Sequence, residues 1–189
     1  MKTLIIYAHP NTPGHCSYIL EQVKAKLDTK EYEILDLYKI KYDPVLHENE
    51  LYTAGGEDIS KQDLEIQNKI KRSNHLIFIY PVWWGSMPAI LKGFFDKVFK
   101  NGFAFKFKDK KGVGLLKDKT ATIFITSGAS KLVYLLFLGN IPKKIIKRLI
   151  LGFCGIKSKF YHIGNCTIIN EKKKQEIKKV VNKALNEIR

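Results

Sequence analysis

The sequence predicts an α/β domain in which helices cover both faces of a parallel sheet. Apolar runs of strand length alternate with amphipathic stretches of helix length, and short turns separate them. With 45% hydrophobic and 27% charged residues, the 189-residue chain has the composition of an ordinary globular domain. The chain shows no internal repeat and no linker rich in Gly, Ser or Pro, so we expect one domain over residues 1–189.

The order of the predicted elements follows from their apolar patterns. Continuous apolar runs at residues 3–8, 75–80 and 120–126 are typical of strands that are covered on both faces. The alternating pattern at 33–38 predicts a strand near the edge, and 157–163 predicts a short last strand. Apolar side chains at helical spacing predict helices in the remaining segments, at residues 16–28, 58–72, 88–99, 142–151 and 171–188.

The formal charge of +15 comes almost entirely from lysine, because Arg72, Arg148 and Arg189 are the only arginines. Nucleic-acid sites usually recruit arginine for bidentate contacts, and no motif of the usual binding modules is present. We therefore expect no nucleic-acid partner. A lysine excess is more typical of a solvated surface, which would attract anionic partners such as dinucleotides or acidic lipids.

The cysteines and the apolar runs bear on the cellular location. Cys16, Cys154 and Cys166 are scattered and form no CxxC pair, which favours free thiols in a reducing compartment. No His, Cys and carboxylate cluster has zinc spacing, so we expect no metal. The longest apolar run, residues 132–138, is shorter than the roughly 20 residues that cross a bilayer, and the N-terminus does not read as a signal peptide. We expect a cytoplasmic protein.

Ligands of such sheets bind outside the carboxyl ends of the strands. Four segments of this chain fall there: residues 9–17, 81–87 and 126–134, and the turn near Gly164. The first three hold most of the unusual residues, so we expect the functional site among them.

The loop at residues 9–17 leads into the first helix, whose free amides and dipole favour an anion. His9, His15 and Ser17 could add side-chain donors to a phosphate. Neither GxGxxG nor GxxxxGK[ST] is present, so the loop is neither the dinucleotide fingerprint nor a P-loop. The alternative is a helix capped by Ser17 with incidental histidines.

Both tryptophans of the chain, Trp83 and Trp84, stand side by side in the second loop. Two adjacent indoles in a loop that contains Gly85 cannot both face one core, so at least one should line a cleft. Planar aromatic walls suit a planar ring ligand. Gly85 lacks a side chain and allows the backbone to approach the edge of that ligand.

The third loop, residues 126–130, is rich in small donors and can aim amides at the polar edge of the same ring. An ordinary strand-to-helix cap is the alternative. Tyr134 lies in an apolar stretch and would by default be a core residue. If it points to the cleft, its phenol is a candidate donor to developing negative charge.

The run from Tyr80 to Phe99, the opening Ala8-His9-Pro10 and residues 126–129 together resemble the flavodoxin-like NAD(P)H:quinone oxidoreductase family. That family includes the mammalian quinone reductases, bacterial modulator-of-drug-activity proteins and the ancillary flavoproteins of potassium-efflux systems. The resemblance implies a flavodoxin-like three-layer sandwich, with a parallel five-stranded sheet and helices on both faces.

The resemblance also implies a flavin that is bound non-covalently at the carboxyl edge of the sheet. FMN is favoured over FAD, because the chain is shorter than the mammalian enzymes and has no obvious segment to hold an adenine. The family positions assign the phosphate region to His9, His15, Cys16 and Ser17, the ring to Pro81, Val82, Trp83, Trp84 and Gly85, and the pyrimidine edge to Thr126, Ser127, Gly128 and Ala129.

Tyr134 falls where the quinone reductases carry a catalytic tyrosine that helps to stabilise the reduced, anionic flavin. The chain departs from the family pattern at three places. Asn140 stands where those enzymes have the histidine that assists the tyrosine, and Gly85 stands where they have an aromatic residue. Residues 14–16 replace their serine-aromatic-asparagine pattern.

The implied activity is hydride transfer from NAD(P)H through the flavin to quinones or similar flat acceptors, such as nitroaromatics and azo compounds, with ping-pong kinetics. The family also favours homodimers with the active site at the subunit boundary. Residues 132–138 are a candidate for that contact, and a buried helix is the alternative interpretation of the same run.

A regulatory flavoprotein subunit of a membrane potassium-efflux system is the alternative function. The basic segment at residues 141–151 offers such a partner a surface, and a helix of this kind can also lie on an acidic membrane. Packing of its apolar side on the sheet is the favoured interpretation. One-electron carriers of the flavodoxin type are typically acidic, unlike this chain.

Overall fold

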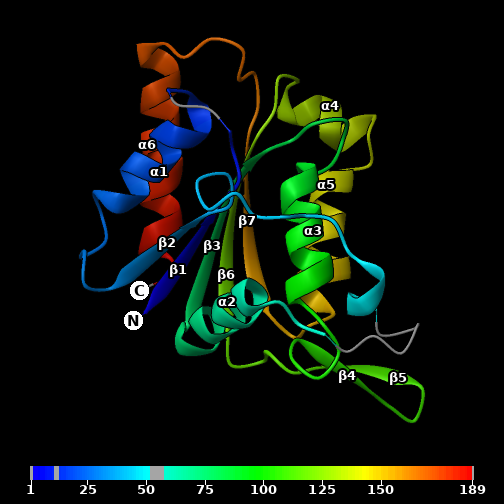
Figure 1. Cartoon of the computed structure of the whole chain (residues 1–189). Coiled ribbons are helices and arrows are strands. Elements are labelled where there is room, and N and C mark those ends of the chain that lie inside the picture. Colours follow the sequence, from blue (N-terminus) through cyan, green and yellow to red (C-terminus); the bar gives the residue numbers. More distant parts are fainter. Residues whose placement is uncertain (1, 11–12, 52–57, 189) are drawn as a thin grey trace.

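Five parallel strands form the central sheet in the order β2-β1-β3-β6-β7 (Figure 1). The computed structural model describes residues 2–10, 13–51 and 58–188. Every neighbouring pair of strands in this sheet is parallel, so the prediction of a parallel five-stranded sheet is confirmed. The strands are β1 (Thr3–Tyr7), β2 (Tyr32–Asp36), β3 (His75–Pro81), β6 (Thr120–Thr126) and β7 (Lys157–Ile163).

The interior strands β1 and β3 are buried along their whole length, which explains their unbroken apolar runs. Their side chains alternate between the two faces of the sheet. Ile5 and Tyr7 belong to the hydrophobic cluster on one face, and Leu4 and Ile6 to the cluster on the other. Burial of one Leu or Ile side chain stabilises the fold by about 1.5–3 kcal/mol. The alternating strand β2 lies at the edge, as predicted.

Helices cover both faces of the sheet, as the sequence predicts (Figure 1). On one face lie α1 (His15–Lys24) and α6 (Glu171–Asn186). On the other lie α2 (Lys61–Arg72), α3 (Ala89–Val98) and the helical residues 141–152. The result is a three-layer arrangement in which each sheet face has its own apolar core.

The predicted basic helix consists of two parts, α5 (Ile141–Lys144) and the π-helix η3 (Ile145–Gly152). Ile146 and Leu151 are fully buried in the core, as the favoured interpretation of this segment requires. Leu149 lies on the outer side and is exposed.

The structure contains elements that the apolar patterns did not predict. A hairpin of β4 (Phe105–Lys108) and β5 (Lys111–Gly114) packs its Phe105 ring against Phe153, with 5.0 Å between the ring centroids. The short helix α4 (Lys131–Leu136) follows β6. The interpretation of residues 132–138 as a buried helix is wrong, because within this run only Tyr134 is buried.

Two further observations concern the earlier expectations about location. Cys16, Cys154 and Cys166 all carry free thiols. Over residues 2–10, 13–51 and 58–188, we find no helix whose length and hydropathy would allow it to cross a lipid bilayer.

Candidate active site

The loops that follow β1, β3, β6 and β7 meet at the carboxyl edge of the sheet and enclose a pocket of about 200 Å³. Backbone hydrogen bonds hold the strand ends level: Val82 N donates to Thr126 O at 2.7 Å, and Ser127 N donates to Ile163 O at 3.1 Å. The residues that line this pocket are His9, Gly14, His15, Cys16, Pro81, Val82, Trp83, Thr126, Ser127, Gly128 and Cys166. The pocket therefore unites all three loops in which the sequence placed the site.

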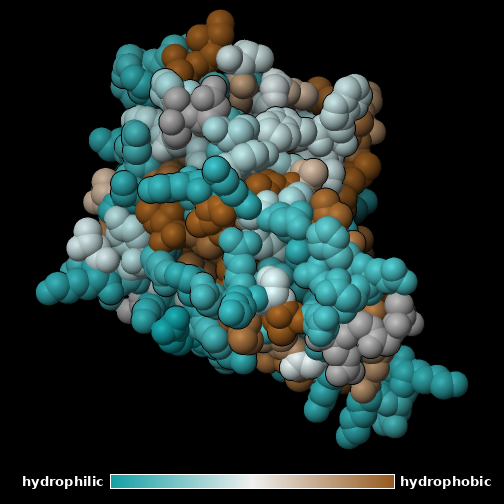
Figure 2. Space-filling model, viewed as in Figure 1, coloured by the Kyte–Doolittle hydropathy of each residue, from teal (hydrophilic) through white to brown (hydrophobic). Residues whose placement is uncertain are grey.

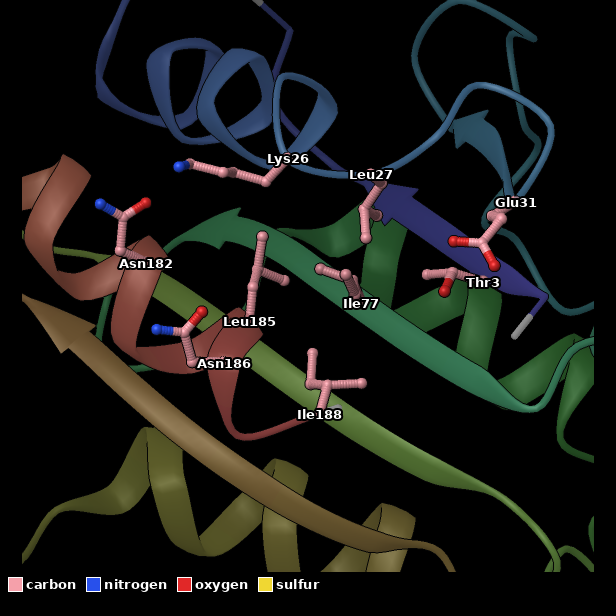
Figure 3. A pocket seen from close by; sticks show the side chains of 9 residues that line it. All are labelled: Thr3, Lys26, Leu27, Glu31, Ile77, Asn182, Leu185, Asn186 and Ile188. Carbon is pink, nitrogen blue, oxygen red and sulfur yellow. The ribbon is translucent and has the colours of Figure 1, made fainter.

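A larger cavity of about 720 Å³ lies at the opposite, amino edge of the sheet, next to Thr3 and Ile77 (Figure 3). Lys26 and Leu27 beside it follow the end of α1, and its other wall is the last part of α6. The carboxyl ends of two helices thus point toward this cavity and give it a partial negative potential. A phosphate-bearing ligand is disfavoured there, and parallel sheets bind their ligands at the other edge.

The first wall of the pocket is the start of α1. Gly14 is the residue before the first helical turn, and the Ser17 hydroxyl both accepts from Gly14 N at 2.8 Å and donates to Gly14 O at 2.9 Å. Ser17 is buried and is not among the lining residues. Its hydroxyl serves the helix start, as the alternative interpretation of this loop expected.

His15 presents an unsatisfied polar atom at this wall. Its Nε2 is buried and has no hydrogen-bond partner among the described residues. Burial lowers the pKa of His15; a hydrogen bond with the backbone of Ile168 partly opposes this shift, and the positive charge of Lys173 adds to it. A buried ring nitrogen without a partner is costly to a folded protein, and a bound anion would supply the missing partner.

The second wall is a tight turn at residues 83–86. Trp83 N donates to Ser86 O at 2.9 Å, and Ser86 N donates to Trp83 O at 3.0 Å. The two central residues, Trp84 and Gly85, both have positive φ angles, of 48° and 74°, as a type I′ turn requires.

This turn separates the two indoles. Trp83 lines the pocket, with 42% of its surface exposed, and its ring lies 6.1 Å from the ring of His9. Trp84 extends fully into solvent. Neither indole is buried in the core. Trp83 offers an aromatic face at the pocket, while Trp84 and Gly85 stand outside the lining.

The third wall is the end of β6 and the loop after it. The Thr126 hydroxyl lies 3.3 Å from Cys16 Sγ and ties this wall to α1. Gly128 opens onto free space, because a Cβ atom added there would meet nothing within 4 Å. Ala129 lies behind the wall, where its carbonyl accepts from the Ser127 hydroxyl at 2.8 Å.

Behind this wall stands His162, which the sequence analysis missed. The single hydroxyl proton of Ser127 goes to the Ala129 carbonyl, so Nε2 of His162 is the donor in its 2.6 Å contact with Ser127 Oγ. Burial lowers the pKa of His162 to about 4, which keeps the ring neutral. Tyr134 packs edge-on against it at 5.0 Å and is not among the lining residues.

The pocket offers binding groups rather than a nucleophile. Burial raises the pKa of Cys16 to about 12 and also raises the pKa of Cys166, so both thiols are protonated at neutral pH. None of the described residues that line the pocket carries a carboxylate side chain. Among residues 2–10, 13–51 and 58–188, no group of three His, Cys, Asp or Glu side chains is placed to hold a metal ion.

The family of the chain follows from the comparison with known proteins. A family model described as "Flavodoxin-like fold" matches residues 1–188. The chain belongs to this flavodoxin-like family. The flavodoxin-like three-layer fold that the resemblance implied is therefore confirmed.

Two proteins of similar sequence are named as oxidoreductases. An "Uncharacterized NAD(P)H oxidoreductase" of Haemophilus influenzae is 33% identical over 180 residues, which cover 91% of this chain and 88% of that protein. "NAD(P)H dehydrogenase [quinone] 1" of Cavia porcellus is 31% identical over 152 residues, which cover 70% of this chain. The chain spans only 55% of the length of the Cavia protein.

Solved structures show the same fold. Smu.1420 from Streptococcus mutans superposes with a TM-score of 0.84 at 31% identity, covering 98% of this chain and 100% of that one. An FMN-dependent NADH-azoreductase of Bacillus anthracis, solved in complex with FMN, has a TM-score of 0.73 at 21% identity, with 99% and 98% covered. At this identity the second likeness shows the fold alone.

The pocket of this flavodoxin-like protein fits a phosphate-bearing planar ligand. The buried Nε2 of His15, which has no partner in the described part of the chain, lies at the start of α1, whose amides and dipole favour an anion. The exposed face of Trp83 and the open backbone at Gly128 stand on the other two walls. An aromatic face and a bare backbone edge together suit a flat ring with polar edges.

The positive φ of Trp84 predicts a local strain that substitution should relieve. A bulky L-residue in this conformation costs about 1–2 kcal/mol, and asparagine tolerates it far better. Since Trp84 is fully exposed, Trp84→Asn loses no burial. We expect this variant to be more stable by about 1 kcal/mol in urea unfolding. Trp83→Asn is the matched control and should be less stable than the parent. Equal stability of Trp84→Asn and the parent would show that the turn is not strained.

Proposed function

We propose that the protein is a flavin-dependent NAD(P)H oxidoreductase whose acceptors are quinones or similar flat molecules. The observation that carries this proposal is the pairing, in one pocket, of the half-exposed indole of Trp83 with the buried Nε2 of His15, which no described residue hydrogen-bonds. The indole of Trp83 suits a planar ring, and the Nε2 atom of His15 suits a phosphate. The names of the Haemophilus and Cavia relatives support the same reaction class.

The chain offers three groups of residues to hold the flavin. We assign the phosphate region to the start of α1, with His9, His15, Cys16 and Ser17. In this region Ser17 shapes the loop through its hydrogen bonds to Gly14 rather than by facing the pocket. The second group is Pro81, Val82 and Trp83 beside the ring, with Trp84 and Gly85 in the adjoining turn outside the lining. The third group is Thr126, Ser127 and Gly128 at the polar edge of the ring, with Ala129 behind them.

FMN is the flavin that we propose. The azoreductase of Bacillus anthracis, which has the same fold, binds FMN. FAD is the alternative. Chromatography of the flavin that is released from the protein distinguishes the two.

Bound flavin supplies the hydride chemistry, and the protein supplies position, stacking and electrostatics. Trp83 lines the pocket and the neighbouring Trp84 extends into solvent, so we assign the mouth of the pocket to this turn. NAD(P)H and the acceptor use this one mouth in turn, which gives ping-pong kinetics. Quinones, nitroaromatics and azo compounds share the flat shape that such a mouth admits.

Tyr134 is our proposed catalytic residue. It is buried next to His162, which donates a hydrogen bond to the pocket residue Ser127. Asn140, which takes the position of the family histidine, donates its backbone N–H to the Tyr134 carbonyl at 2.7 Å. Tyr134 therefore lies directly behind the wall that we assign to the polar edge of the ring, in ring contact with His162.

We also propose a homodimer, as the family resemblance implies, and a cytoplasmic location, which the three free thiols favour. The oxidoreductase names of the relatives favour an enzyme over the regulatory subunit of a potassium-efflux system. Sedimentation velocity of the purified protein measures the oligomeric state directly.

Initial-rate kinetics test the proposed reaction. The FMN-loaded protein should oxidise NADH or NADPH in the presence of a small quinone and give parallel double-reciprocal lines when both substrates are varied. Free FMN at the same concentration is the control. Rates no higher than those of free FMN, with every acceptor class tried, would refute the proposal.

The role of His15 predicts a pH-dependent affinity for FMN. Burial lowers the pKa of this histidine in the free protein, so the ring is neutral at pH 7. A phosphate dianion beside Nε2 favours the protonated ring and raises its pKa in the complex, so that binding takes up a proton. FMN affinity should therefore rise as the pH falls from about 8.5 to 6.5, by at most about tenfold per pH unit.

Isothermal titration measures this dependence. Riboflavin, which lacks the phosphate, and the His15→Gln variant are the controls, and both should bind with a flatter pH profile. A His15→Gln protein with the pH profile of the parent would remove His15 from the phosphate site.

The Tyr134→Phe variant tests the catalytic role of the phenol. Loss of one hydrogen bond to developing charge should slow turnover by about tenfold, or roughly 1.4 kcal/mol, while FMN stays bound. Stopped-flow absorbance separates reduction by NAD(P)H from reoxidation by the quinone. Unchanged rates of both half-reactions would show that Tyr134 has no part in the reaction.

A further inference from the structure

The amino edge of the sheet holds a cavity that neither the flavin pocket nor the proposed homodimer uses. Figure 2 shows apolar side chains gathered along the edge of the molecule over α4 and α5, which is the contact expected for the homodimer. The amino-edge cavity, of about 720 Å³, lies between the end of α1 and the last turn of α6. Figure 1 shows the start of β1 and the end of α6 at that edge, away from α4. The cavity therefore stays open when two copies pair through α4.

Four apolar side chains form the floor of the amino-edge cavity. Ile77 of β3 and Leu185 of α6 are buried, and Leu27 and Ile188 are partly buried beside them. Figure 3 shows these four side chains gathered in the centre. Binding sites for small molecules are mostly apolar and have volumes of roughly 300–1,000 Å³. The size and the floor of this cavity therefore suit a ligand with a compact apolar body.

Polar side chains stand on two sides of this floor. Figure 3 shows Thr3 and Glu31 on one side, and Asn182 and Asn186 on the other. The two asparagines are four residues apart and therefore lie on one face of α6. Asparagine is a poor helix former, so the place of Asn182 within α6 indicates that its amide serves the cavity. A few polar groups around an apolar floor are typical of a ligand site.

The charge around the amino-edge cavity differs from that of the rest of the surface. The chain has 33 lysines and arginines and a net charge of +15. Two cavities beside α5 have three and four cationic lining residues. Among the described residues that line the amino-edge cavity, Lys26 is the one lysine or arginine. Its ammonium group lies on the Asn182 side, away from Glu31 (Figure 3).

Negative charge at the amino-edge cavity outweighs this lysine. The carboxyl ends of α1 and α6 each carry about half a negative charge, so together they balance Lys26. The carboxylate of Glu31 then leaves the cavity with a surplus of negative charge. A carboxylate accepts several hydrogen bonds at once, so Glu31 can bind a further donor whatever else it contacts. The cavity therefore favours a cationic hydrogen-bond donor.

We propose that the amino-edge cavity binds an amphipathic amine, a small molecule with an ammonium group and a compact apolar body. The apolar body covers Ile77 and Leu185, and the ammonium group donates to the Glu31 carboxylate and the Thr3 hydroxyl. Asn182 meets polar groups at the other end of the ligand. This site is separate from the flavin pocket, and its ligand binds whether or not the protein is an oxidoreductase.

A neutral apolar molecule is the competing ligand, because the apolar floor alone would hold it. Three naphthalene compounds of nearly equal size separate the two alternatives by charge. At neutral pH naphthylmethylamine is a cation, naphthylmethanol is neutral and naphthoate is an anion. An apolar cavity without charge selection binds the first two equally, whereas the proposed site prefers the amine.

Amide NMR spectra of the full chain, with FMN added, measure the affinity and the place of binding together. Naphthylmethylamine should shift the amide signals of residues 26–31 and 182–188, with a dissociation constant of about 1 mM or lower. Naphthylmethanol should bind about fivefold more weakly, and naphthoate more weakly still. The signals of residues 81–86 report separately on any binding at the flavin pocket.

Two substitutions with opposite expected effects test the charge argument. Glu31→Gln should weaken the binding of naphthylmethylamine by about fivefold, and Lys26→Met should strengthen it by about threefold because a repelling charge is removed. Both side chains are exposed, so we expect both variants to fold. Glu21→Gln and Lys178→Met are the matched controls, because both side chains are exposed on α1 and α6 and neither lines the cavity. The controls should leave the affinity within about twofold of the parent.

Three results would overturn the proposal. One is the absence of shifts at residues 26–31 and 182–188 with naphthylmethylamine at about 10 mM. Another is an equal affinity of the parent chain for naphthylmethylamine and naphthylmethanol, a comparison that needs no variant. The third is an unchanged affinity for the amine in both Glu31→Gln and Lys26→Met. Because none of these measurements uses NAD(P)H or turnover, they fail or succeed independently of the enzymatic activity.

Discussion

The parallel pairing of β1, β3 and β6 is the constraint on which the rest of the structure depends. Tyr7 is paired with Ile79, and Pro81 with Thr126, so the three strands end together. Three loops far apart in the sequence are thereby brought to one edge. The start of α1, the indole of Trp83 and the open backbone at Gly128 face one pocket for this reason alone. A shift of one residue in either pairing would separate them.

Within that frame, most polar groups around the pocket are satisfied by the protein itself. Ser17 bonds Gly14, Thr126 contacts Cys16, and Ser127 lies between Ala129 and His162. These contacts hold the walls without using a ligand. One lining residue differs: the Nε2 atom of His15 has no hydrogen-bond partner among the described residues. The backbone of Trp84, in the turn beside the pocket, is strained by its positive φ. Unsatisfied or strained groups at a pocket are typical of a site that is completed by its ligand.

The sheet was predictable because burial on both faces requires unbroken apolar runs, which stand out in β1, β3 and β6. The hairpin of β4 and β5 was not, because its residues are rich in lysine and its turn, Asp109-Lys110, lacks the glycine that marks such turns. The exposure of α4 was also hidden, since an apolar run alone does not reveal whether it faces a core or solvent. Whether α4 packs against the sheet depends on the tertiary structure and not on the apolar pattern of the helix itself.

The pocket walls were predictable because ligand sites of such sheets follow the carboxyl ends of the strands. The sequence did not reveal which way each side chain turns. The positive φ of Trp84 turns its indole away from that of Trp83. The Ser17 hydroxyl is used in its hydrogen bond with Gly14 at the start of α1. Cys166 follows the turn near Gly164, which the sequence analysis marked as a strand end without assigning it a role. His162 reaches Ser127 from β7, a neighbour that only the strand order supplies.

The absorption spectrum of the purified protein tests the central claim most directly. If the pocket at the carboxyl edge binds FMN, the protein is yellow as isolated or after incubation with FMN, and heat releases one FMN per chain. A colourless protein that takes up neither FMN nor FAD would contradict the assignment of this pocket to a flavin.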